Sequence, residues 1–291
     1  MGKKATVKDV AREAGVSAAT VSYIMNNRTD MKISEATRKK VLQIANLLDY
    51  TPSHAAKSLA TGRNNIIGIS YHLNDKTPCR NIEITSFVNL LIRRLNRLKY
   101  DVLFMPVQSA GISFSSINVD GIITVDLTES EFSALSNNSM VPIINTDMII
   151  NDPLFYQICT DYHRLIREAA DYLKDDFYII TDRFANEKYA EAILSGIDSD
   201  RIIYFSEDND ERIKSIGDSK VIILNEYLAL MTLPYTRPEN TVVISSGKVD
   251  YKFPDKVKII EKDISKKANL AINILLNALD KKFDIDHVYM V

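Results

Sequence analysis

Residues 6–22 of the chain read Thr6-Val-Lys-Asp-Val-Ala-Arg-Glu-Ala-Gly-Val-Ser-Ala-Ala-Thr-Val-Ser22. Thr6 and Asp9 have the spacing of a capping box, and this spacing predicts a helix that begins at Val7. Apolar residues then recur three and four positions apart and form one stripe along that helix. Gly15 ends the helix, because glycine readily adopts the left-handed conformation that helix C-termini favour.

A second short helix follows after a tight turn. Ser17 is an N-cap for a helix from Ala18 to about Asn26. Two helices joined by about three residues, with a glycine in the turn, have the spacing of a helix-turn-helix, here over about residues 7–26. Ser34 caps a third helix, which completes a small all-α domain over residues 1–51.

The outward face of the second helix carries small and hydroxyl-bearing side chains. In a helix-turn-helix this helix enters the major groove of DNA. Ala18 and Ala19 cannot donate to a base edge, so we expect them to contact a thymine methyl group, and we expect Tyr23 to hydrogen-bond to a base. The hydroxyls expected at phosphates are those of Ser17, Thr20 and Ser22. The alternative is a helix face of small residues with no partner.

Charge is distributed unevenly along the chain. The net charge is -2, but residues 1–63 carry eleven basic and five acidic side chains, a net of +6. The remaining residues carry 25 basic and 33 acidic side chains, a net of -8. A basic head on an acidic body indicates that the head binds an anionic partner, with a basic solvated surface as the alternative.

Composition excludes several other classes of protein. The 291 residues are 46% hydrophobic, which is enough for more than one folded domain. No apolar run approaches the roughly 18 residues of a membrane helix, and the N-terminus has no apolar signal segment, so we expect a soluble cytoplasmic protein. Cys79, Cys159 and the four histidines have no disulfide or metal-site spacing, so neither a metal nor a cofactor is expected.

The quoted stretch and the residues after it resemble the LacI/GalR family of bacterial transcription regulators. The resemblance runs almost without gaps from Thr6 to Ser70 and includes Ile33-Ser-Glu-Ala-Thr-Arg38 and Tyr50-Thr-Pro52. It implies that the partner is double-stranded operator DNA. Taken with the outward face of the second helix, the expected DNA-binding residues are Thr6, Ser17, Ala18, Ala19, Thr20, Ser22, Tyr23, Asn26, Thr37, Tyr50, Ser53, Ala56 and Leu59.

Residues 52–63 form a linker that favours a helix but is too short for a helix that is stable alone in water. The resemblance implies a hinge helix that becomes ordered on DNA and pairs with its dimer mate. Leu59 stands where the family inserts a leucine into the minor groove, and Ala56 stands where the chain lies against the groove floor. The alternative for Leu59 is a core leucine beneath the linker.

From residue 64 to residue 291 the pattern changes to apolar runs that alternate with helical stretches. We expect strands at 66–71, 101–105, 121–125, 141–145 and 177–181, and helices at 82–98, 129–136 and 162–173. Nearly continuous apolar strands with helical crossovers predict an α/β body in which helices cover both faces of a parallel sheet.

The resemblance gives this body a more specific architecture. It implies a periplasmic-binding-protein-like body of two parallel-sheet subdomains, with a small effector in the cleft between them. The first subdomain is then about 66–158 plus about 259–283, and the second is about 159–258 plus a last strand at 287–290. A C-terminal tetramerisation heptad is absent, so the resemblance implies a homodimer.

The cleft departs from the family pattern. Asp161 and Asn225 stand where family members place polar groups for sugars or nucleobases, and Arg183 is a possible substitute in a segment that is usually rich in arginine. Only about fourteen residues separate Met105 from Asp120, so the body is shorter than usual. A bound ligand needs several hydrogen-bond partners, because each buried polar group left unpaired costs about 1–3 kcal/mol. The cleft offers few such partners, so several ligands remain possible. These are a sugar, a sugar phosphate, a nucleobase or a protein co-regulator, with no ligand as the alternative.

The sequence therefore predicts a sequence-specific DNA-binding transcriptional regulator, a repressor, that binds a pseudo-palindromic operator as a homodimer in the cytoplasm of a bacterium, at the nucleoid when bound. One alternative keeps the DNA binding but makes the body a dimerisation scaffold without a small-molecule site. Another class is a solute-binding protein or an enzyme. No Ser/His/Asp set, phosphate loop or dinucleotide motif supports an enzyme.

Overall fold

The structure is a computed structural model that describes residues 5–25, 31–50, 63–105, 118–174, 176–205, 210–247, 252–282 and 286–291. The chain divides into two compact units, Met1–Asn64 and Asn65–Val291. Each unit has its own hydrophobic core, so each is described by itself.

The first unit, the head, contains three helices. They are α1 (Val7–Ala14), α2 (Ala18–Met25) and α3 (Glu35–Leu47). The inward stripes of the three helices meet in one core of buried side chains: Val10, Ala11, Ala14, Val21, Ile24, Val41 and Ala45. The predicted helix-turn-helix and the third helix are confirmed.

Local capping determines where α1 begins and ends. The Asp9 amide donates to Thr6 Oγ1 at 3.4 Å, and the Thr6 amide donates to the Asp9 carboxylate at 2.9 Å. Gly15 adopts the left-handed conformation with φ 66°. Both predicted signals act as expected, because each depends only on neighbours in the sequence.

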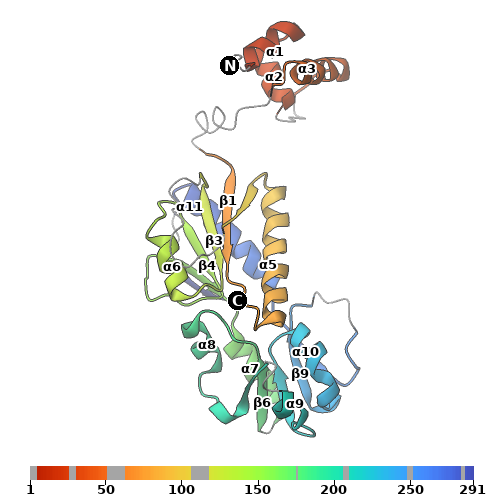
Figure 1. Cartoon of the computed structure of the whole chain (residues 1–291), viewed down its shortest axis with the longest axis vertical. Helices are drawn as coiled ribbons and strands as arrows, with labels where there is room; N and C mark the ends of the chain where they lie inside the picture. The colour runs from red at the N-terminus through yellow and green to blue at the C-terminus, as the bar shows by residue number, and fades with distance from the viewer. Residues whose placement is uncertain are drawn as a thin grey trace. The chain divides into compact units, whose positions relative to one another are not determined.

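The second unit, the body, begins with a six-stranded parallel sheet in the order β11-β5-β4-β3-β1-β2. Helices α5 and α11 pack on one face and α6 packs on the other, in two separate hydrophobic clusters (Figure 1). The strands are β1 (Ile66–Tyr71), β2 (Asp101–Phe104), β3 (Gly121–Val125), β4 (Ile143–Thr146), β5 (Tyr156–Cys159) and β11 (Val288–Met290). The helices are α5 (Pro78–Arg97), α6 (Glu129–Ser136) and α11 (Ile264–Leu279). We call these elements the first subdomain.

A five-stranded parallel sheet in the order β10-β9-β8-β6-β7 forms the second subdomain. Helices α7 and α8 cover one face, and α9 and α10 cover the other. The strands are β6 (Phe177–Thr181), β7 (Ile202–Tyr204), β8 (Lys220–Ile223), β9 (Thr241–Ser245) and β10 (Lys258–Glu261). The helices are α7 (Tyr162–Leu173), α8 (Glu187–Leu194), α9 (Asp210–Lys214) and α10 (Glu226–Thr232). The predicted α/β body of two parallel sheets is confirmed.

Two expected assignments of segments to subdomains are wrong. The last strand β11 pairs with β5 in the first subdomain, not with the second sheet. Conversely, β10 pairs with β9 in the second subdomain. The chain therefore crosses between subdomains after Cys159 and again after Glu261, and Val291 lies beside the first crossing because its amide donates to the Cys159 carbonyl. Both assignments came from the family resemblance. Strand pairing is a long-range choice, and the apolar pattern of a strand does not reveal its sheet.

Helix α5 begins at Pro78, four residues before the predicted start at Ile82. Pro78 occupies the first turn, where its missing N–H costs nothing. This extra turn carries Cys79 and Arg80, which are both buried. Strands β5, β7, β8, β9 and β10 and helices α8, α9 and α10 were not among the predicted elements. The short segment between Met105 and Asp120 lies largely outside the described residues.

Candidate DNA-binding surface and the cleft of the body

The outward face of α2 is open to solvent. Ala19 and Ser22 are exposed, and Ala18, Thr20 and Tyr23 are half-buried, whereas Val21 and Ile24 on the opposite face are buried. The structure therefore presents the side chains expected at bases on one face of α2. Of the predicted DNA-binding residues, Asn26, Ser53, Ala56 and Leu59 lie outside the described residues.

Hydroxyl groups mark the N-termini of the helices in the head. Ser17 Oγ accepts the Thr20 amide at 3.0 Å, and the two side-chain oxygens lie 2.8 Å apart. The same arrangement occurs at α3, where Ser34 Oγ accepts the Thr37 amide at 3.1 Å and lies 2.8 Å from Thr37 Oγ1. A helix N-terminus carries partial positive charge and binds anions, so these ends of the helices suit phosphate groups.

Tyr50 packs against the core of the head, and its burial raises the pKa of its phenol. Only the accessible part of the Tyr50 side chain could therefore make the predicted contact with DNA. Thr6 is engaged in the α1 capping box, where its hydroxyl donates to Asp9 at 2.7 Å.

In the body, acidic residues directly follow three parallel strands. Asp126 follows β3, Asp147 follows β4 and Asp182 follows β6. The carboxyl ends of parallel strands are where α/β proteins bind ligands, and this position was the signal that the sequence analysis missed. All three carboxylates are buried between the two subdomains.

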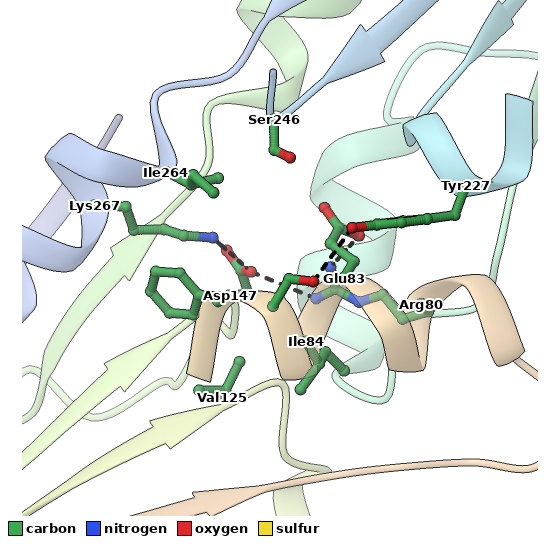
Figure 2. Close-up of a pocket in the computed structure, with 11 residues that line it drawn as sticks. Arg80, Glu83, Ile84, Val125, Asp147, Tyr227, Ser246, Ile264 and Lys267 are labelled. Atoms are coloured by element: carbon green, nitrogen blue, oxygen red, sulfur yellow. Dashed lines mark hydrogen bonds and ion pairs between the residues drawn. The ribbon is translucent and has the colours of Figure 1, made fainter. Parts of the chain in front are cut away.

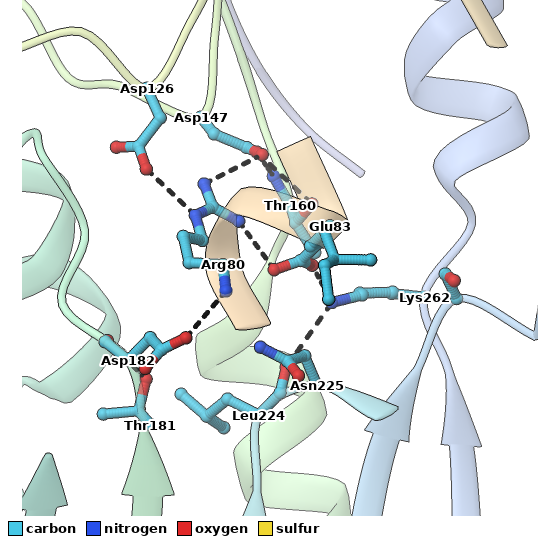
Figure 3. A network of polar contacts seen from close by, with 12 residues as sticks. Arg80, Glu83, Asp126, Asp147, Thr160, Thr181, Asp182, Leu224, Asn225 and Lys262 are labelled. Atoms are coloured by element: carbon cyan, nitrogen blue, oxygen red, sulfur yellow. Dashed lines mark hydrogen bonds and ion pairs between the residues drawn. The ribbon is translucent and has the colours of Figure 1, made fainter. Parts of the chain in front are cut away.

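Arg80, in the first turn of α5, lies at the centre of these carboxylates (Figure 3). Its guanidinium donates to Asp126 at 2.9 Å, to Glu83 at 2.8 Å and to Asp147 at 3.5 Å. Its backbone amide donates to Asp182 at 2.7 Å. The side chain of Arg80 is only 3% exposed, so this is a buried network and not a surface ion pair.

Two lysines complete the network. Lys267 of α11 places its Nζ 2.7 Å from each carboxylate oxygen of Asp147 and 3.0 Å from Thr160 Oγ1. Lys262, just after β10, forms an ion pair with Glu83 and donates to the Tyr162 hydroxyl at 2.8 Å. These bonds offset the large cost of removing the charges from water.

The pKa values of the carboxyls follow from the balance of burial against these cations. Burial raises the pKa of Glu83, but Lys262 and Arg80 outweigh it and lower that pKa to about 2. Burial also raises the pKa of Asp147, but Lys267 and Arg80 outweigh it and lower that pKa below its ordinary value.

The other two carboxyls shift in the opposite direction. At Asp126 burial outweighs Arg80 and raises the pKa. Burial raises the pKa of Asp182 to about 6, because only the Arg80 amide opposes it strongly. Asp182 Oδ1 is also the one buried side-chain polar atom without a hydrogen-bond partner in the described part of the chain.

Direct hydrogen bonds join the two subdomains. Asp126 Oδ1 of the first subdomain accepts the amides of Ala185 and Asn186 of the second, at 3.0 Å and 3.2 Å. Asn186 Oδ1 accepts the Ile149 amide at 3.0 Å. On the surface, Lys188 pairs with Glu129 at 2.7 Å. The body is therefore closed by contacts between its own side chains and backbone.

One cavity between the subdomains is small. Its lining includes Arg80, Glu83, Asp147, Lys267, Tyr227 and Ser246 (Figure 2). The cavity has a volume of about 10 Å³, enough for about one water, whereas sites for small molecules usually measure about 300–1,000 Å³.

The three residues predicted to bind an effector each have a local role. Asp161 caps α7 by accepting the Arg164 amide at 3.0 Å, and Asn225 caps α10 by accepting the Leu228 amide at 2.6 Å. Arg183 is exposed and stacks on the Tyr204 ring, 4.1 Å from its centroid. No hydrogen bond or ion pair between described residues joins these three side chains to one another.

Cys79 and Cys159 are buried free thiols, and burial raises the pKa of each to about 12. The described residues contain no group of three or more side chains suited to hold a metal ion. Within that part of the chain, no helix has both the length and the apolar character to cross a membrane.

The head matches a known protein family. Residues 6–53 match the family described as "Bacterial regulatory proteins, lacI family". Over 65 residues the chain is 52% identical to the HTH-type transcriptional regulator RegA of Clostridium acetobutylicum, covering 22% of this chain and 19% of that protein.

A longer match extends into the body. The chain is 29% identical over 180 residues to the probable HTH-type transcriptional repressor ExuR of Bacillus subtilis, which covers 57% of this chain and 50% of that protein. The chain thus spans about half the length of this curated relative. The crystal structure of the lac repressor dimer bound to operator and the anti-inducer ONPF has the same fold, with a TM-score of 0.66 and 17% identity over 99% of this chain and 96% of that one.

Proposed function

We propose that this protein is a sequence-specific DNA-binding transcriptional regulator. The proposal rests on its LacI-family helix-turn-helix domain and on a body with the fold of LacI-type repressors. It acts as a repressor in the bacterial cytoplasm and binds a pseudo-palindromic operator as a homodimer. It is not an enzyme. The observation that carries the proposal is α2, whose buried face completes the core of the head while the residues of its outward face are exposed or half-buried; in a helix-turn-helix this is the face that enters the major groove.

In this mechanism the two protomers place two α2 helices in successive major grooves, with half-sites about one helical turn apart. Ala18 and Ala19 contact a thymine methyl, and Tyr23 hydrogen-bonds to a base. Between the half-sites, Leu59 of each protomer enters the minor groove and bends the duplex.

The test is the ratio of specific to non-specific binding. An operator is first selected from genomic or random DNA with the full chain, and binding is then measured at fixed salt for operator and unrelated DNA. Tyr23→Phe and Leu59→Ala should each lower this ratio. The loss of one base contact should weaken the free energy of specific binding by about 1–3 kcal/mol. If both variants leave the ratio unchanged, this mode of recognition is wrong.

The matched controls are Tyr172→Phe and Leu154→Ala. Both residues are exposed in the body, so neither change should affect binding to the operator. Failure to select any preferred DNA sequence would contradict the proposal as a whole.

A second candidate keeps the DNA binding but makes the body a dimerisation scaffold without a sugar, sugar phosphate or nucleobase effector. The small cavity between the subdomains favours this candidate, because a volume of about 10 Å³ is too small for such a molecule. Thermal unfolding with a panel of these compounds is the test. A true effector at a hundred times its Kd should add about 2.7 kcal/mol of stability, and any such hit excludes the scaffold.

A further inference from the structure

The surroundings of Arg80 have the chemistry of a guanidinium-binding site. Three carboxylates accept the N–H groups of its guanidinium, from Asp126, Glu83 and Asp147. The Phe184 ring lies beneath the guanidinium, with 4.4 Å between the guanidinium carbon and the ring centroid. Carboxylates in the plane and an aromatic ring on the face are what a planar cation prefers.

This site lies at the junction of the subdomains. The carboxylates of Asp126 and Asp147 follow strands of the first subdomain, whereas Phe184, whose ring lies on the guanidinium, belongs to the second. Asp182 of the second subdomain accepts the backbone amide of Arg80 and not its guanidinium. One Asp126 oxygen accepts from Arg80 and the other accepts the amides of Ala185 and Asn186. Arg80 therefore orients the carboxylate to which the second subdomain is bonded.

We propose that the centre of the body is a guanidinium-binding site that the chain occupies with its own Arg80, and that this internal ligand holds the two subdomains closed with no effector bound. In the absence of Arg80, the carboxylates of Glu83, Asp126 and Asp147 lose their shared partner in a buried site. Separation of the subdomains then lets water reach them. The proposal concerns the body alone, so it can fail or hold whether or not the chain binds DNA.

Closure can be measured through three amides that bond across the cleft, those of Ile149, Ala185 and Asn186. Hydrogen exchange is followed in the full chain without DNA or effector. In the wild type these amides should exchange slowly. In Arg80→Ala they should exchange at least about a hundredfold faster, as expected when a buried ion network loses one partner. The Val242 and Val243 amides in β9 should keep their protection.

Chemical rescue identifies the site as one for guanidinium. Methylguanidinium at millimolar concentration, against sodium chloride at equal ionic strength, should restore slow exchange in Arg80→Ala by filling the vacated space. The matched control is Arg164→Ala, which removes an arginine that is 57% exposed and paired on its own helix. That variant should keep the three amides protected and should not respond to methylguanidinium.

Three results would overturn the proposal. They are fast exchange of these amides in the wild type, full protection in Arg80→Ala, and loss of protection that methylguanidinium does not restore. If Arg80→Ala folds only with methylguanidinium present, Arg80→Lys decides. A lysine keeps the charge but cannot bridge three carboxylates, so protection should fall, and wild-type protection in that variant would contradict a guanidinium site.

Discussion

At Asp182 burial and hydrogen bonding act in opposite directions on one carboxyl group. Its Oδ2 accepts the Arg80 amide and so caps the first turn of α5, although the two residues belong to different subdomains. Its Oδ1 is buried without a partner. A charged carboxylate there is costly, and this is the physical reason that its pKa is raised to about 6.

This gives a prediction for the Asp182→Asn variant. Because the pKa of Asp182 is raised from 3.8 to about 6, the folded protein binds this proton more tightly than the unfolded chain does. The stability of the wild type should therefore fall, through this group, as the pH rises from about 4 to about 6. The variant has no such proton, so its stability relative to the wild type should increase over this range by about 1–3 kcal/mol.

Urea unfolding of both proteins at several pH values measures this difference. Asp255→Asn, at an exposed position, is the control and should show no such trend. A difference that stays constant from pH 4 to pH 7 would mean that Asp182 is not protonated in the folded body.

At the scale of elements, the helices of the head and of the body are specified differently. Helix α1 begins and ends where its own caps place it, through Thr6, Asp9 and Gly15. In contrast, Thr77 makes no side-chain cap at the start of α5. The first turn of α5 is stabilised by Asp182 from the other subdomain, so local signals placed its start too late.

Gly15 offers a prediction at this scale. It has φ 66°, and a Cβ there would meet no atom within 4 Å, so a substitution there introduces backbone strain without a clash. Gly15→Ala should destabilise the head by about 1–2 kcal/mol, because alanine disfavours the left-handed conformation. Gly15→Asn should cost less, since asparagine tolerates that conformation.

Hydrogen exchange of the Val10 and Ala14 amides in the full chain measures the effect. Exchange should be fastest in Gly15→Ala, intermediate in Gly15→Asn and slowest in the wild type. Equal rates in the two variants would show that the backbone conformation at Gly15 does not limit the stability of α1.

For the whole molecule, net charge is divided between the two units. Residues 1–63 carry a net of +6 and the remaining residues a net of -8. A basic head should release counterions when it binds DNA, and an acidic body should be repelled from the duplex. The near-neutral total of -2 therefore describes neither unit.

Affinity for the operator should accordingly fall steeply with salt, by about 10³–10⁵ between 50 and 200 mM if each dimer contacts six to ten phosphates. Lys39 and Lys40 are exposed on α3, and replacing both with Gln should reduce the slope of log Kd against log salt. The matched control replaces Lys266 and Lys282, which are exposed on the body, and should leave the slope unchanged. Equal slopes for the two pairs would exclude α3 from the phosphate contacts.

The sequence alone determined the head and several elements of the body, because caps, left-handed glycines and apolar periodicity depend on residues within one or two turns of each other. It predicted α1, α2, α6 and α7 and the strands β1, β3 and β6 with little error. It also indicated the family, since the residues that carry the resemblance lie in one continuous stretch.

Only the tertiary structure decided which sheet β10 and β11 join and what fills the cleft. Arg80 meets Asp126, Asp147 and Asp182 across 46, 67 and 102 positions of sequence. No local pattern specifies such partners, because chain folding brings them together and burial then makes each charge depend on the others. For Asp161 and Asn225 the family resemblance implied a role in effector binding, whereas in the structure both side chains cap local helices.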